Sequence, residues 1–158
     1  MKNRLMLGSA LAVVLATVSC DPMSSPVDPI TPNRLRADGL HLVVSTSRTG
    51  ANSMTFRIKV ENRGPEGATL HFMTGQAFDV EIVDSSDRVV WRLSHGASFP
   101  QVLWDLDLAV GESSAWEREW DLRGNDQEPL SPGPYMCRAF ITCWPRDRGL
   151  IAEFSLTI

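Results

Sequence analysis

The chain has 158 residues, a usual length for one folded domain, and its 43% hydrophobic and 22% charged residues are typical of a globular protein. The formal net charge is −4 at pH 7, and lysine and arginine form no stripe along the sequence. We therefore expect neither a nucleic-acid-binding surface nor a polybasic membrane-binding patch, because both need clustered positive charge.

Residues 1–19 have the pattern of a signal peptide. Lys2 and Arg4 precede an apolar stretch, residues 5–18, which is shorter than the roughly 20 residues of a membrane-spanning helix. The sequence Thr-Val-Ser-Cys that ends at Cys20 resembles the lipobox of bacterial lipoproteins, and this resemblance implies that Cys20 is lipidated. Ordinary cleavage nearby would instead leave Cys20 without a role. In both cases we expect export, and with the lipid a membrane-anchored protein of the cell envelope.

Residues 20–37 form a proline-rich tether. They contain Pro22, Pro26, Pro29 and Pro32 among serine, aspartate and asparagine. Such a segment cannot form a regular helix and lacks the periodicity of a strand, so we expect an extended linker. The expected organisation is a signal peptide (1–19), a tether (20–37) and a folded domain (38–158).

The folded part shows alternating apolar and polar residues, which is the signature of β-strands. No stretch of ten residues has a helical period, and turn residues separate the runs, as at 62–65 and 131–134. The apolar runs begin at Leu40, Met54, Leu70, Phe78, Val89, Leu106, Trp116, Tyr135 and Ala152. Eight or nine short antiparallel strands with one apolar face each predict an all-β fold, an immunoglobulin-like antiparallel β-sandwich.

One predicted hairpin can be given a register. If residues 84–87 form a four-residue turn, Val80 lies opposite Trp91, and the other apolar residues of both strands fall on the same face. On the other face Asp79 lies opposite Arg92, which is a favourable pair of opposite charges. A slip of one residue would mix the two faces, so the pattern favours this register.

Six segments of the folded part, in their order and spacing, resemble a known family. They are residues 70–80 (Leu-His-Phe-Met-Thr-Gly-Gln-Ala-Phe-Asp-Val), 89–94, 99–101 (Phe-Pro-Gln), 108–113, 120–121 and 130–135. The set is similar to the intracellular proteinase inhibitors of the BsuPI type, over nearly all of residues 38–158. The resemblance implies an immunoglobulin-like sandwich that inhibits proteases, mainly serine proteases. Because this chain carries an export signal, a function other than inhibiting a cytoplasmic protease stays open.

Some residues of these segments are expected to be structural. Gly75 would supply a backbone angle that other residues resist, Gln76 would bond to loop backbone, and Asp79 would pair with Arg92. The alternative is that Gly75 and Gln76 belong to a recognition loop. The full set of signature residues is Gly75, Gln76, Phe78, Asp79, Trp91 and Arg92.

Residues 94–104 are the first candidate for contact with a partner. An inhibitor commonly presents an exposed, stiff loop, because ordering the loop beforehand lowers the entropy cost of binding. The candidate contact residues are His95, Phe99, Pro100, Gln101 and Trp104. A second candidate loop is the proline-rich stretch 122–134, and either stretch can instead be an ordinary surface loop.

Trp116 and Trp120 lie on the same face of one predicted strand, with Arg118 between them. We expect both rings to pack in the core, although exposed rings would form a cation–π patch. Cys137 and Cys143 could form a disulfide only if the chain folds back, since six residues of strand span about 20 Å and a disulfide needs Cα atoms within about 7 Å. Otherwise we expect Cys137 in the core.

Chemistry-bearing motifs are absent from the sequence. His41, His71 and His95 lack the spacing of metal ligands, and there is no nucleophile elbow or glycine-rich phosphate loop. We therefore expect no metal, no cofactor and no enzymatic activity. The sequence favours a domain that binds a protein, as a non-covalent inhibitor of a serine protease or as a non-inhibitory scaffolding lipoprotein, and that meets the membrane only through its anchor.

Overall fold

The computed structural model describes residues 39–144 and 150–158, so the predicted signal peptide, Cys20 and the whole tether lie outside the described residues. The described residues contain nine strands and no helix that could span a membrane. The strands are β1 (Leu40–Gly50), β2 (Ser53–Asn62), β3 (Ala68–Phe72), β4 (Phe78–Val83), β5 (Val89–Arg92), β6 (Trp104–Leu108), β7 (Ser113–Trp120), β8 (Pro134–Ile141) and β9 (Ile151–Thr157).

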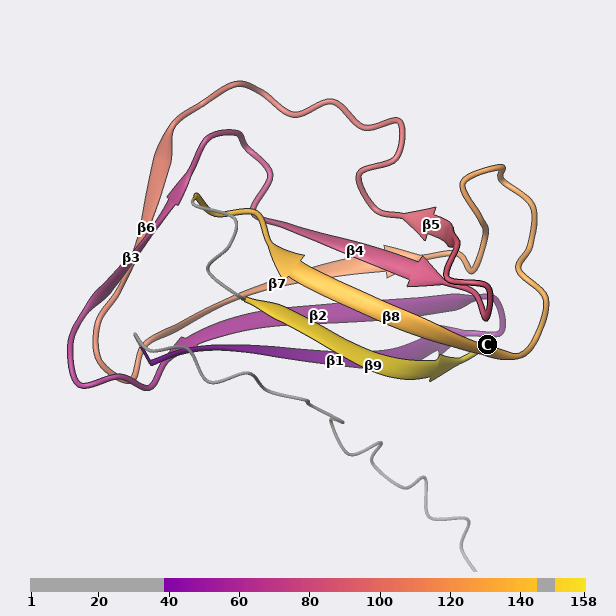
Figure 1. Cartoon of the computed structure of the whole chain (residues 1–158), viewed down its shortest axis with the longest axis horizontal. Coiled ribbons are helices and arrows are strands. Elements are labelled where there is room, and N and C mark those ends of the chain that lie inside the picture. The colour runs from indigo at the N-terminus through magenta and orange to yellow at the C-terminus, as the bar shows by residue number, and fades with distance from the viewer. Residues whose placement is uncertain (1–38, 145–149) are drawn as a thin grey trace, which may run out of the picture.

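All strand pairs are antiparallel, and they form three sheets with the orders β1-β2-β7, β5-β4-β8-β9 and β3-β6. The two larger sheets make the sandwich, and the β3–β6 ribbon stands at one end of it (Figure 1). The predicted all-β, immunoglobulin-like sandwich of eight or nine strands is thereby confirmed.

Aromatic rings join the two larger sheets at the centre of the core. Phe56 of β2 is fully buried and stacks on Trp91 of β5, with ring centroids 6.0 Å apart. Trp120 of β7 is 2% exposed and stacks on both rings, at 5.9 Å from Phe56 and 4.9 Å from Trp91. Trp116 is half-buried against Phe78. The prediction of core packing is confirmed for Trp120, whereas Trp116 packs against the core and stays partly exposed.

The β4 strand is buried at all six positions, whereas alternation predicted one exposed face. Asp79 and Glu81, on that second face, are 1% and 9% exposed. Arg92 from β5 and Arg138 from β8 both reach Glu81, at 3.3 and 3.5 Å. Carboxylates can lie under the surface here because arginines from both neighbouring strands compensate their charge.

The predicted register of the β4–β5 hairpin is wrong, because Trp91 pairs with Ile82 and not with Val80. The turn closes one residue later on the β5 side than expected, since Asp84 N donates to the carbonyl of Arg88 and Val83 pairs with Val89. A bulge follows where the register changes between Ile82 and Val83. Each irregularity adds one residue to the β5 side. Two such shifts restore the original side-chain parity, so the apolar faces still match and the sequence pattern could not reveal the difference.

The sequence pattern predicts a turn at Arg48-Thr49-Gly50 and an alternating strand from Leu106 to Val110, and both boundaries differ in the structure. The β1 strand continues to Gly50, and the turn that follows it is formed by Ala51 and Asn52. The β6 strand begins at Trp104, which was predicted to lie in a loop, and ends at Leu108, so Val110 lies in the turn before β7 and is 59% exposed.

A buried asparagine fixes the base of the β3–β6 ribbon. Asn62, at the end of β2, is fully buried. Its Nδ2 donates to the carbonyl oxygens of Glu66 at 2.7 Å and Leu108 at 2.9 Å, and its Oδ1 accepts from Gly64 N at 2.9 Å. One side chain thus ties the end of β2, the loop after it and the end of β6 together, which sets the position from which the ribbon extends.

Candidate functional site

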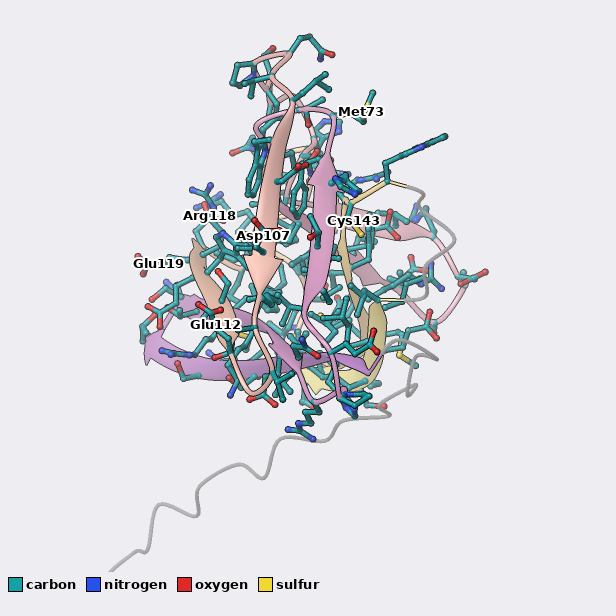
Figure 2. The ribbon with its side chains drawn as sticks, turned by 90° about the vertical axis from the view of Figure 1, so that its left-hand side faces the viewer. Met73, Asp107, Glu112, Arg118, Glu119 and Cys143 are labelled. Atoms are coloured by element: carbon teal, nitrogen blue, oxygen red, sulfur yellow. The ribbon has the colours of Figure 1, made fainter. Side chains whose placement is uncertain are left out.

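Two connections meet at the outer end of the β3–β6 ribbon. The connection between β5 and β6 crosses the top of the molecule in Figure 1, and the β3–β4 connection lies beneath it. In Figure 2 Met73, the first residue after β3, lies at this end with its side chain pointing outward. The structure therefore brings the predicted contact loop next to the signature residues Gly75 and Gln76.

Gly75 and Pro100 hold the two connections together. Gly75 N donates to the carbonyl oxygen of Pro100 at 2.9 Å, and a Cβ on Gly75 would lie 2.8 Å from Pro100 Cγ. The φ of Gly75 is not positive, so the expected reason for this glycine is wrong. Glycine is needed here because the proline ring approaches the backbone too closely for any side chain.

Gln76 and Phe99 complete the contact between the connections. Gln76 Nε2 donates to the carbonyl oxygen of Phe78 at 3.1 Å, and the Gln76 carbonyl accepts from Thr142 Oγ1 at 2.5 Å, so Gln76 bonds to loop backbone as expected. Phe99 is half-buried. It lies between two open hollows, one of about 530 Å³ that also borders Met73 and one of about 700 Å³.

Trp104 anchors the end of the loop that enters β6. Its ring stacks on the buried Phe72 with centroids 4.0 Å apart and planes 8° from parallel. Its Nε1 donates to the carbonyl oxygen of Thr74 at 2.8 Å. A stacked ring with a satisfied N–H fixes both the position and the orientation of this residue.

The start of the loop is held by Asp79. The two carboxylate oxygens of this buried side chain accept from Arg92 Nε at 2.8 Å, Ser94 Oγ at 2.6 Å and Ser94 N at 3.1 Å. The hydrogen bond that Arg92 donates to Asp79 raises the pKa of Arg92, so its guanidinium stays charged. A tight turn follows, in which Ala97 N donates to the Ser94 carbonyl and Gly96 has a φ of 69°.

Three exposed residues lie between the anchors at Pro100 and Trp104. Gln101 is exposed, Val102 is 44% exposed and Leu103 is 73% exposed. In the part of the chain that the structure describes, the backbone groups of these residues make no hydrogen bond. They form a short exposed segment, residues 101–103, that is held at both ends.

The predicted contact residues do not all come together. Phe99, Pro100, Gln101 and Trp104 lie at the junction of the two connections. His95 lies in the turn at the other end of the loop and borders neither of the hollows around Phe99. Sequence reasoning missed Val102 and Leu103, although two adjacent apolar residues just before an alternating strand were a usable signal of exposure.

The second candidate loop, residues 122–134, packs along the edge of β5. Asn125 N donates to the carbonyl of Val90 at 2.9 Å, and Asn125 Oδ1 accepts from Arg92 N at 2.9 Å. Leu122 is 7% exposed and belongs to the core. Through these contacts the loop covers the edge of β5. This loop is therefore the weaker candidate for contact with a partner.

Cys137 and Cys143 are both buried, and no disulfide joins them. Burial raises the pKa of the Cys137 thiol to about 12, so this thiol stays neutral at physiological pH. Cys137 is thus a small core residue, which was the expected alternative to a disulfide. Among the described residues, histidine, cysteine, aspartate and glutamate form no group that could hold a metal ion.

The family described as intracellular proteinase inhibitor, BsuPI, matches residues 41–144, which contain the exposed segment and both its anchors. No curated protein matches the chain.

Solved structures show only a weak likeness. An alkylpurine DNA glycosylase from Pseudomonas fluorescens has a TM-score of 0.40 and 14% identity over 76% of this chain, which covers 31% of the glycosylase. The CARDB domain of a Pyrococcus furiosus protein has a TM-score of 0.35 and 16% identity over 78% of this chain and 92% of that domain. At these scores the likeness carries no functional argument.

Proposed function

The chain belongs to the intracellular proteinase inhibitor family, and we propose that it inhibits a serine protease non-covalently from the cell envelope. The family membership supports a protein partner and a binding function in place of catalysis. The match covers the loop between β5 and β6 and the β3–β4 connection that supports it. The proposal assigns the inhibitory contact to this loop.

The observation that carries the proposal is the exposed segment 101–103 held between two anchors. Pro100 is fixed against Gly75, and Trp104 is fixed by its stack on Phe72 and its bond to Thr74. A loop that is ordered before binding loses little conformational entropy in the complex. The same restraint opposes cleavage, because the ends of the segment cannot move apart after a peptide bond is attacked.

The location in the envelope is a second part of the proposal, supported by the signal-peptide pattern and the lipobox-like sequence before Cys20. We expect the full chain, expressed in a bacterium, to fractionate with membranes and to carry acyl groups on Cys20 in mass spectra of its N-terminal peptide. Cys20→Ala should move the chain to the soluble fraction. An unmodified Cys20 at the N-terminus of the mature protein would contradict the lipid anchor.

Inhibition can be tested with the full chain purified in mild detergent. It is titrated against serine, cysteine and metalloproteases whose active-site concentrations are known. We expect stoichiometric loss of a serine protease's activity while the chain stays uncut on a gel. A heat-denatured sample is the control, since it can act only as a competing substrate. If all three classes of protease kept full activity while the chain stayed folded and uncut, inhibition would be rejected. The alternative, a scaffolding role, would then be favoured.

A further inference from the structure

We propose that Leu103 is the side chain that enters the primary specificity pocket of the target protease, and that this pocket is apolar. The inference rests on the proposed function and deepens it, because it names the contact residue and the class of the target. Serine proteases select the residue at the scissile position by the chemistry of this pocket: a carboxylate in trypsin selects a basic side chain, and a hydrophobic slot in chymotrypsin an apolar one.

Leu103 is the most exposed of the large hydrophobic side chains in the described residues, at 73%. Its neighbours on either side are less exposed, since Val102 is 44% exposed and Trp104 is half-buried in its stack on Phe72. A leucine as exposed as this contributes little to folding, and its burial in an apolar pocket would be favourable. Its position beside the anchor at Trp104 fixes its backbone.

The backbone around Leu103 is available for pairing with an enzyme. In the described part of the chain, residues 101–103 make no backbone hydrogen bond, and β6 pairs only with β3, so the other edge of β6 is open. An extended peptide commonly binds by adding a strand to its partner, with backbone hydrogen bonds giving affinity and side-chain pockets giving specificity. The segment 101–103 offers the backbone groups, and Leu103 offers the side chain.

The hollow beside Gln101 is uncharged and partly apolar. The hollow of about 530 Å³ beside Gln101 is lined by seven residues, none of them charged. Two of these residues are strongly exposed hydrophobic side chains, Met73 at 54% and Trp144 at 59%. Figure 2 shows Met73 pointing outward at this end. Apolar groups at the edge of a contact exclude water when a partner binds, and this hollow offers such groups beside the segment.

The exposed segment also argues against a trypsin-like target. It contains no lysine or arginine, so it offers nothing to a pocket with a carboxylate at its base. Val102 would suit the smaller pocket of an elastase-like enzyme, but its side chain is less exposed than that of Leu103. The structure therefore favours a chymotrypsin-like or subtilisin-like pocket over either alternative.

The test uses the full chain with chymotrypsin, subtilisin, elastase and trypsin. Because Leu103 is exposed, Leu103→Asp should leave the melting temperature unchanged while raising the inhibition constant for the inhibited enzyme at least about 100-fold. The matched control is Val110→Asp, which changes an exposed apolar residue at the opposite end of β6 and should leave inhibition unchanged. Leu103→Arg should create inhibition of trypsin.

The outcomes separate this inference from the proposed function. Inhibition by the unaltered chain that survives Leu103→Asp would overturn the assignment of Leu103 and leave the inhibitory function standing. Equal losses of inhibition from Leu103→Asp and Val110→Asp would also overturn the assignment of Leu103. A loss of inhibition confined to Val102→Asp would overturn it too. If the unaltered chain inhibited none of the four enzymes, both the proposed inhibitory function and the assignment of Leu103 would lose their basis.

Discussion

Asp79→Asn is expected to lower the free energy of unfolding by about 2–4 kcal/mol. The carboxylate is 1% exposed and accepts hydrogen bonds from Arg92 and from the hydroxyl and backbone N–H of Ser94. An amide of the same shape removes the negative charge and turns one acceptor into a donor that faces other donors. Arg92 can turn partly to water because it is 42% exposed, which keeps the loss below that of a fully buried pair.

The effect of Asp79→Asn is measured by urea denaturation of the full chain. Asp105→Asn is the matched control, because Asp105 also makes a side-chain hydrogen bond, with His71 Nδ1 at 2.8 Å, but both side chains are more than half exposed. The control should cost less than about 1 kcal/mol. If both variants changed stability equally, the buried carboxylate would not be the element that holds the start of the loop.

Trp104→Ala is expected to lower the free energy of unfolding by about 2–3 kcal/mol, below the usual range for a fully buried tryptophan because the ring is half-buried. The variant removes the stack on Phe72 and the hydrogen bond to Thr74. It also frees one end of the segment 101–103. Inhibition measured where the variant is still folded should therefore weaken, because the segment must then be ordered on binding.

Trp104→Phe separates the two contributions of this anchor. A phenylalanine ring can keep the stack on Phe72 but cannot donate to Thr74, so the expected loss of stability is about 1 kcal/mol. Inhibition should be largely retained. Unchanged inhibition by the folded Trp104→Ala variant would mean that the segment acts without its anchor, contrary to the proposed mode of binding.

The fold could be predicted from the sequence because strand alternation is a local signal. The runs that begin at Leu40, Met54 and Phe78, for example, lie in strands that begin at or within one residue of the predicted starts. The register of the β4–β5 hairpin could not be predicted, because a turn that closes one residue later on the β5 side and a bulge cancel in their effect on side-chain parity. The burial of Glu81 depends on Arg92 and Arg138, which come from two other strands.

The candidate site could be predicted only in part. The sequence pointed to residues 94–104 and to Gly75 as separate features, and the contact between Gly75 and Pro100 joins them. That contact follows from how the β3–β6 ribbon meets the sandwich, which no local pattern encodes. For the same reason the exposure of Leu103 became evident only when Trp104 was seen to turn inward onto Phe72.

The most direct test of the proposed contact is amide hydrogen exchange, followed by mass spectrometry, of the chain alone and bound to the serine protease that it inhibits. The unbonded amides of residues 101–103 should exchange rapidly in the free chain and slowly in the complex. Residues 73–76 beside them should gain protection, and residues 122–134 should not change. Protection confined to 122–134, or none at 101–103, would contradict inhibition through the β5–β6 loop.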